Sequence, residues 1–151
     1  MKRLSSVLLL AACVLTFGPD LWAQNTCTSA TITGRYCYRV TGFASYFGSP
    51  LTPTSSLGTA TLEKTGHDSI AVSISWTQSI GGANESLSGT GVATVKPDCT
   101  GSGTFTVTEF GLPIDFELVV LNEGKLIRMF PKSSAFAQFV MDATFEQMSK
   151  K

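Results

Sequence analysis

Side chains that alternate between apolar and polar, residue by residue, constrain the fold of this 151-residue chain more than any other feature. In the clearest run, Ile70 to Ile80, isoleucine, valine and tryptophan alternate with alanine, serine and threonine, and Gln78 lies in the apolar phase. Successive side chains of a β-strand point to opposite faces of the sheet, whereas a helix repeats every 3.6 residues. The pattern therefore predicts a strand that buries one face.

Seven further segments are predicted to be strands from the same alternation. They are Ile32–Thr41, Leu57–Lys64, Ser86–Val95, Thr104–Thr108, Ile114–Leu121, Leu126–Phe130 and Ala135–Glu146. In the last segment one face of a helix would also be apolar, which is the alternative there: Phe136, Phe139, Val140 and Ala143. A strand is preferred because alanine, phenylalanine and methionine side chains fill one of its faces completely.

Short turns connect most of these segments. Gly81–Asn84 and Asn122–Lys125 are predicted hairpin turns, and Pro97 and Asp98 suit the second and third positions of a type I turn. Hairpins that follow one another at even spacing predict an antiparallel up-and-down sheet. We expect an all-β fold, a single barrel of about eight strands, because closure removes the exposed edges. A β-sandwich is the alternative.

Two glycine-containing stretches are expected to depart from regular strand geometry. Gly42 to Ser56 contains two prolines and four serines, so it is predicted to be a loop, either a plain connection or a lid. Gly101 and Gly103 predict a bend or a bulge where the strand after the type I turn begins.

The first residues have the pattern of an export signal. Lys2 and Arg3 precede the apolar run from Leu4 to Phe17, which is too short to span a bilayer, and a small residue, Ala23, ends the region. We predict a signal peptide over residues 1–23 and a single β-barrel domain over residues 24–151, periplasmic or extracellular, without a transmembrane segment. The alternative is a lipoprotein anchored through Cys13, because the preceding Leu-Ala-Ala resembles a lipobox.

Composition excludes several function classes. Charged residues make up 15% of the chain and the formal net charge is zero, which argues against nucleic-acid binding. The one histidine, His67, lies in a predicted surface turn, and the cysteines do not have zinc-ligand spacing. The chain has no Gly-x-Ser-x-Gly elbow and no glycine-rich loop that enters a helix. No catalytic residue, metal or cofactor is therefore predicted.

Five residues are candidates for contact with a ligand. Tyr36, Tyr38 and Trp76 lie in the apolar phase of their strands, and they either line a pocket or form plain core. Glu109 is in phase with apolar neighbours, and Arg128 lies between Leu126 and Phe130. Inside a barrel each charge would need a partner or a polar ligand group, and the alternative places both at the rim in water.

Five short motifs resemble those of a known group of proteins. They are Cys27, Gly34–Tyr36, Leu57–Ala60, Ser88–Gly91 and Asp98–Gly101. Through them the chain resembles small exported bacterial proteins of uncharacterised function, whose calycin-like barrel is similar to that of allene oxide cyclase. The resemblance implies a barrel and a Cys27–Cys99 disulfide. It carries no catalytic motif, so cyclase activity is not expected from it.

The cysteines that remain after cleavage allow a second pairing. An exported chain meets an oxidising compartment, so one disulfide and one free thiol are expected. Cys27 precedes the first strand and Cys99 lies in a turn, so both are at strand ends, where a barrel gathers its connections. The alternative, Cys27–Cys37, would have to reach a mid-strand residue on the face of Arg35 and Arg39.

Three functions are compatible with these features. The preferred one is an exported, non-catalytic barrel that binds a small apolar or amphipathic molecule. A barrel isomerase or cyclase would need a carboxylate that faces a shaped apolar cavity, and a structural or interaction module would have a solid core. The volume and the lining of the interior therefore decide between them. The sequence makes no prediction of oligomeric state.

Overall fold

The computed structural model describes residues 26–134 and 137–148. The predicted signal peptide, residues 1–23, and Cys13 lie outside these described residues. The strands are β1 (Gly34–Tyr46), β2 (Thr52–Lys64), β3 (Ser69–Ile80), β4 (Ala83–Val95), β5 (Thr100–Val107), β6 (Leu112–Leu121), β7 (Leu126–Pro131) and β8 (Ala137–Gln147). Two short 3-10 helices, η1 (Ser29–Ile32) and η2 (Asn122–Gly124), complete the described part of the chain. Neither these nor any other helix in that part has the length and apolar character needed to cross a membrane.

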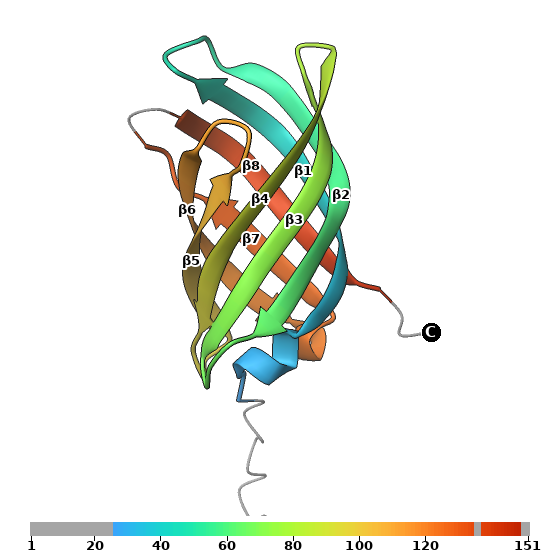
Figure 1. The fold of residues 1–151 in the computed structure, drawn as a ribbon, viewed down its shortest axis with the longest axis vertical. Helices are drawn as coiled ribbons and strands as arrows, with labels where there is room; N and C mark the ends of the chain where they lie inside the picture. Colours follow the sequence, from blue (N-terminus) through green and yellow to red (C-terminus); the bar gives the residue numbers. More distant parts are fainter. Residues whose placement is uncertain (1–25, 135–136, 149–151) are drawn as a thin grey trace, which may run out of the picture.

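The strands close into a barrel, as predicted. Each strand pairs antiparallel with the next, and β1 closes the sheet by pairing with β8 from Tyr36 opposite Gln147 to Tyr46 opposite Ala137 (Figure 1). The last segment is therefore a strand and not a helix. The inward side chains of every strand are mainly apolar and form one continuous core, which explains the alternation in the sequence.

The two ends of the barrel differ. One end, called the closed end here, carries η1, η2 and the turns 65–68 and 96–99 (Figure 1). Ile32 of η1 is completely buried, and the hydroxyl of Ser29 donates to the carbonyl oxygens of Gly66 and His67. The other end, called the open end, carries the connections 47–51, 81–82 and 108–111.

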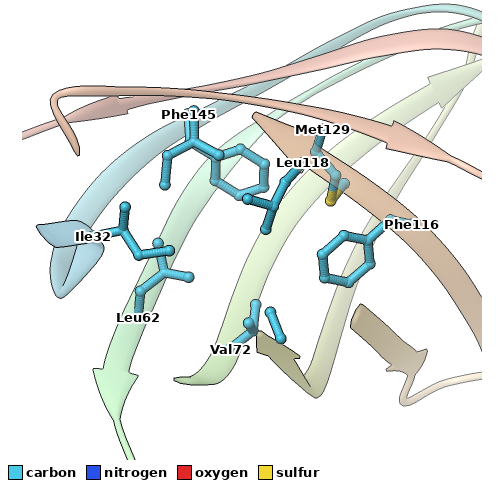
Figure 2. A pocket seen from close by; sticks show the side chains of 9 residues that line it. Ile32, Leu62, Val72, Phe116, Leu118, Met129 and Phe145 are labelled. Atoms are coloured by element: carbon cyan, nitrogen blue, oxygen red, sulfur yellow. The ribbon is translucent and has the colours of Figure 1, made fainter. Parts of the chain in front are cut away.

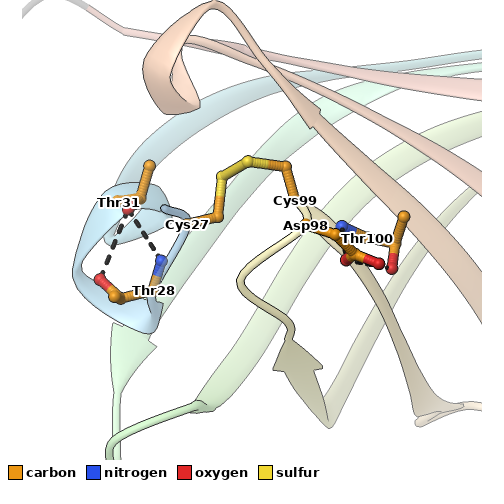
Figure 3. The surroundings of a disulfide bond; sticks show 6 residues. All are labelled: Cys27, Thr28, Thr31, Asp98, Cys99 and Thr100. Atoms are coloured by element: carbon orange, nitrogen blue, oxygen red, sulfur yellow. Dashed lines mark hydrogen bonds between the residues drawn. A yellow bond between two sulfur atoms is a disulfide. The ribbon is translucent and has the colours of Figure 1, made fainter. Parts of the chain in front are cut away.

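A disulfide attaches η1 to the barrel. Cys27 and Cys99 are bonded, as predicted, and their Cα atoms are 5.0 Å apart (Figure 3). Cys99 ends the type I turn predicted from Pro97, because its N–H donates to the carbonyl oxygen of Lys96 over 3.0 Å. Cys99 has a φ of 66°, a left-handed conformation that is typical of the residue after such a turn in a hairpin. A buried disulfide of this kind is typical of proteins in a non-reducing compartment.

The prediction of a loop over Gly42 to Ser56 is wrong. β1 continues to Tyr46 and β2 begins at Thr52, so only residues 47–51 connect them. Gly42 is a strand residue because the backbone of β8 passes beside it, where a Cβ atom would lie 2.6 Å from Met141 Cα. Close approach of two backbones, and not a turn, is what this glycine permits.

The bulge expected at Gly101 and Gly103 is also absent. Both residues lie within β5, and the register with β6 runs without interruption from Thr100 opposite Val119 to Val107 opposite Leu112. A Cβ atom on Gly103 would lie 2.6 Å from Cζ of Phe116. The glycine therefore leaves room inside the barrel for an aromatic ring.

Candidate functional site

A belt of aromatic rings crosses the interior of the barrel. Its members, each from a different strand, are Phe145, Tyr38, Trp76, Phe105 and Phe116. Consecutive ring centroids in this order are 4.9, 6.2, 6.3 and 6.1 Å apart, within the range of favourable edge-to-face and tilted contacts. Phe116 and Phe145 line a cavity towards the closed end, whereas Tyr38, Trp76 and Phe105 line another towards the open end. The belt therefore divides the interior in two.

The lower cavity is a packing defect in an apolar core. Its volume is about 20 Å³, and the side chains around it, including Ile32, Leu62 and Leu118, are all hydrophobic (Figure 2). Such a space is about the size of one water molecule and offers it no hydrogen-bond partner. A ligand site is not indicated there.

The upper cavity is larger and lies in the open half. Its volume is about 40 Å³, against about 20 Å³ for the lower cavity. It is lined by Tyr38, Val40, Tyr46, Ser56, Trp76, Gln78, Leu87, Phe105, Val107, Phe110, Ile114, Met129, Pro131, Phe139, Met141 and Ala143. None of these side chains is charged, and most are apolar, as in typical small-molecule pockets.

One wall of the upper cavity carries buried polar groups, which we call the polar wall: Tyr38, Ser56 and Gln78. Ser56 on β2 and Gln78 on β3 are directly opposite each other, and Tyr38 on β1 is two residues from Val40, the partner of Ser56. The exposed fractions of the three residues are 6%, 8% and 7%. Within the described part of the chain, no other group forms a hydrogen bond with any of these three side chains.

A neighbouring hydroxyl is also unpaired and, unlike the polar atoms of the polar wall, it is out of reach of water. Thr54 lies two residues from Ser56 on the inward face of β2, and its Oγ1 atom is buried without a hydrogen-bond partner in the described residues. An unpaired buried polar group costs about 1–3 kcal/mol, so such groups in native proteins usually bind water or a ligand. A volume of about 40 Å³ holds only a few water molecules. The cavity thus contains more hydrogen-bonding capacity than the protein itself satisfies.

The polar wall is uncharged over the physiological pH range. Burial raises the pKa of the Tyr38 phenol well above its ordinary value, and the nearby Tyr46 raises it further. Burial likewise raises the pKa of Tyr46. Both phenols therefore keep their protons and remain hydrogen-bond donors, as do the hydroxyl of Ser56 and the amide of Gln78.

Two carboxylates lie at the open end, outside the lining of the cavity. Glu85, at the start of β4, and Glu109, in the connection 108–111, are both exposed at the open end. The carboxylate of Glu109 accepts hydrogen bonds from the N–H of Ser88 over 2.9 Å and from its hydroxyl over 3.0 Å. These bonds, above all the one from the backbone N–H, lower the pKa of Glu109.

The five candidate residues that the sequence indicated lie in different parts of the structure. Tyr38 and Trp76 line the upper cavity. Tyr36 lies in the closed end, where its hydroxyl is 2.8 Å from the carbonyl oxygen of Gly124 and 3.0 Å from that of Ile32. Glu109 lies at the rim in water, one of the two placements considered for it.

Arg128 lies outside the barrel and not in the interior. Its guanidinium forms a salt bridge of 3.0 Å with Asp142 on β8. Every residue from Leu126 to Phe130 except Arg128 is apolar, so the sequence does not reveal which face of β7 is buried. Ile127 and Met129 are the inward residues, which turns Arg128 outward.

Ser56 and Gln78 were not among the candidates. The sequence does carry a signal for Gln78, because it occupies the apolar phase of the clearest strand. The sequence carries no such signal for Ser56, because the stretch Gly42 to Ser56 has the composition of a loop. In this chain, polar residues in the buried phase of a strand lie at the upper cavity, whereas the charges near apolar residues do not.

The wall of the barrel is incompletely paired beside the upper cavity. Within the described residues, β7 and β8 pair only from Leu126 opposite Glu146 to Met129 opposite Ala143. The part of β8 nearer the open end, from Ala137 to Asp142, pairs with β1 alone. Met141 on this part and Pro131 at the end of β7 both line the cavity.

The third cysteine lies on the outer surface. Cys37 is free and exposed, in an outer groove of about 350 Å³ that it lines with Arg39, Thr41, Asp142, Thr144 and Glu146. Its outward orientation on β1 agrees with the alternation of the sequence. Among the described residues, no group of histidine, cysteine and carboxylate side chains has an arrangement that would hold a metal ion.

Comparison with known proteins shows the fold. No family model matches the chain, and no curated protein matches it in sequence. The redesigned β-barrel b11L5F_LGL matches with a TM-score of 0.58 and 14% identity over 80% of this chain and 95% of the other. EF1p2_mFAP2b bound to DFHBI matches with a TM-score of 0.57 and 13% identity over 83% and 98%. The redesigned barrel mFAP1 bound to DFHBI matches with a TM-score of 0.55 and 14% identity over 79% and 97%.

These likenesses establish a closed, eight-stranded antiparallel barrel and nothing finer. The predicted resemblance to small exported bacterial proteins stays a prediction. At least three of the matching barrels, mFAP1, mFAP0 and EF1p2_mFAP2b, are described with a small molecule, DFHBI, bound to them.

Proposed function

We propose that this protein is an exported, non-catalytic β-barrel that binds a small, uncharged and mainly apolar molecule in its upper cavity. The observation that carries the proposal is the polar wall: three buried side chains that face an otherwise apolar cavity and form no hydrogen bond with the described protein. A ligand that enters the open end would satisfy them. The small-molecule complexes of these three barrels with the same fold support this use of the interior.

The ligand requires space that the cavity does not yet offer. The cavity, at about 40 Å³, is smaller than a ring compound. Met129 and Met141 line it, and unbranched methionine side chains adapt their shape readily. Phe110, which also lines the cavity, is 48% exposed, so protein atoms do not enclose its ring completely. Displacement of these three side chains would extend the cavity into its mouth.

Export is the second part of the proposal. Residues 1–23 have the pattern of a signal peptide, and the Cys27–Cys99 disulfide is typical of an oxidising compartment. N-terminal sequencing of the exported protein should give Gln24 as the first residue. A lipid-modified N-terminus at Cys13 would contradict this and would place the protein on a membrane surface.

The isomerase alternative lacks support, because no carboxylate is among the side chains that line the upper cavity. The solid-cored module has one observation in its favour, the small free volume of the interior. A binding measurement separates it from the ligand-binding barrel.

The test uses N-phenyl-1-naphthylamine, an uncharged apolar dye that fluoresces when it leaves water. We expect saturable binding at one site per chain. Ala143→Leu, which fills the upper cavity, should weaken binding at least tenfold. Ala93→Leu is the matched control, because Ala93 is equally buried but lines the lower cavity. Absence of saturable binding, or equal loss in both folded variants, would support the solid-cored module instead.

Native mass spectrometry gives an independent result. Protein purified from its own host should carry a bound small molecule, seen as a mass that is lost on unfolding. The same experiment on Ala143→Leu should show less of this adduct.

A further inference from the structure

The hydrogen-bonding groups of the polar wall indicate a class of ligand. We propose that the upper cavity selects an uncharged ring compound that carries a carbonyl oxygen, and that Gln78, Ser56 and Tyr38 recognise this oxygen. The inference rests on the proposed function, since it specifies the ligand of the same cavity. It goes further, because an apolar cavity alone would show no preference for a carbonyl group.

The three side chains together form a cluster of donors. The phenol of Tyr38, the hydroxyl of Ser56 and the amide of Gln78 each offer at least one N–H or O–H group, and a carbonyl oxygen accepts two such bonds. Side chains directly opposite each other in an antiparallel pair have Cβ atoms about 4.5–5.5 Å apart, so Ser56 and Gln78 can share one acceptor. Tyr38, on the adjacent strand β1, faces the same cavity. The raised pKa of Tyr38 keeps its proton available.

The rest of the cavity favours a ring. Trp76 and Phe105, which meet edge to face with centroids 6.3 Å apart, form its floor. Phe139, which contacts Tyr46 edge to face at 5.8 Å, adds a third ring from β8, the strand next to β1. Flat apolar molecules pack well between such rings.

The charges around the cavity disfavour an anion. A carboxylate in the cavity would lose its hydration without gaining a cationic partner, because no Lys or Arg lines the cavity. Glu85 and Glu109 add negative charge at the open end. A ketone or aldehyde is therefore favoured over the corresponding acid.

The test compares ligands of matched shape by displacement of N-phenyl-1-naphthylamine from the whole mature chain. 2-Acetylnaphthalene and 2-isopropylnaphthalene differ in a carbonyl oxygen replaced by a methyl group. In the wild type the ketone should displace the dye at a concentration about tenfold lower than 2-isopropylnaphthalene does, as expected for two good hydrogen bonds. 2-Naphthoate should displace it more weakly than either.

Variants assign the preference to the polar wall. In Gln78→Leu and in Ser56→Ala the ketone should lose most of its advantage, whereas displacement by 2-isopropylnaphthalene should stay within about twofold of wild type. Gln138→Leu is the control, because Gln138 is exposed on the outer face of β8, and it should keep the full preference. The serine variant removes a single atom, so it decides the matter if Gln78→Leu does not fold.

The outcomes separate the two proposals. Saturable dye binding with equal displacement by the matched pair would overturn the carbonyl preference and leave the proposed function standing. A preference that persists in both polar-wall variants would also overturn it. Complete absence of dye binding would overturn both.

Discussion

At the residue scale, two buried polar side chains with similar sequence patterns differ in whether the fold provides them with hydrogen-bond partners. Tyr36 and Gln78 both occupy the apolar phase of a strand. The hydroxyl of Tyr36 lies between the carbonyl oxygens of Ile32 and Gly124, so its hydrogen-bonding capacity is used within the fold. The amide of Gln78 has no such partner among the described residues. The first residue therefore stabilises the protein, whereas the second is available to a ligand.

Tyr36→Phe should destabilise the protein without changing dye binding. The substitution leaves two carbonyl oxygens at the closed end without their shared donor, a loss of about 1–3 kcal/mol in the free energy of unfolding. Urea denaturation measures this value, and dye titration serves as the control because the upper cavity is unaffected. A change below about 0.5 kcal/mol would contradict the structural role of the hydroxyl.

The pH dependence of the same variant gives a second readout. Burial raises the pKa of Tyr36 to about 12 in the folded protein, against about 10 in the unfolded chain. A raised pKa favours the protonated form, so the contribution of Tyr36 is complete below pH 10 and is lost as the pH rises towards 12. Tyr36→Phe should therefore lose less stability than wild type over this alkaline range.

How Tyr36 differs from Gln78 could not be predicted from the sequence. The carbonyl group that binds Tyr36 belongs to Gly124, 88 residues further along the chain. The polar wall likewise depends on the register that sets Ser56 opposite Gln78. Alternation along one strand specifies which face is buried, but it contains no information about which residue lies across from it.

At the element scale, η1 depends on the disulfide for its attachment. The bond joins residues separated by 72 positions, and Cys27 also donates its N–H to the carbonyl oxygen of Pro97 over 3.3 Å. The sequence allowed this pairing to be predicted, because both cysteines lie at strand ends and Cys37 faces outward. It did not allow η1 itself to be predicted, since Ile32 continues the alternation of β1 and was expected to be part of the strand.

Removal of the disulfide should cost a large share of the stability of a domain of this size. In the chain-entropy model, closure of a loop of this length stabilises by roughly 4 kcal/mol, and small domains have only about 5–15 kcal/mol in total. Denaturation of Cys27→Ala/Cys99→Ala should therefore show this loss, and a reducing agent should lower wild-type stability to a similar value. Cys37→Ala is the matched control, because the exposed thiol has no structural partner and its loss should change stability by less than about 0.5 kcal/mol. Equal free energies of unfolding for Cys27→Ala/Cys99→Ala and Cys37→Ala would contradict the role given to the disulfide.

At the scale of the whole molecule, the barrel could be predicted and its asymmetry could not. Eight alternating segments joined by short turns determine an up-and-down sheet, and closure follows from the need to pair its edges. The closed end has η1, the disulfide and an aromatic belt above it, whereas the open half has a cavity and an incompletely paired wall. This asymmetry depends on the different lengths of the strands. β7, from Leu126 to Pro131, is too short to pair with the whole of β8.

The same asymmetry should appear in hydrogen exchange. Backbone amides in the closed half are paired with a strand on both sides. From Ala137 to Asp142, β8 pairs with β1 alone, and on its other side the amides of Ala137 and Phe139 donate only to the hydroxyls of Ser134 and Ser133. Peptides from this part of β8 should exchange at least tenfold faster than peptides that cover Ala143 to Gln147, because partly paired strands open locally at lower cost. N-phenyl-1-naphthylamine should slow exchange in the first group, since Phe139 and Met141 line the cavity, and should leave the peptide that contains Cys99 unchanged. Uniform protection along β8, or slowing spread evenly over the barrel, would show that the open half is not the site that responds to a ligand.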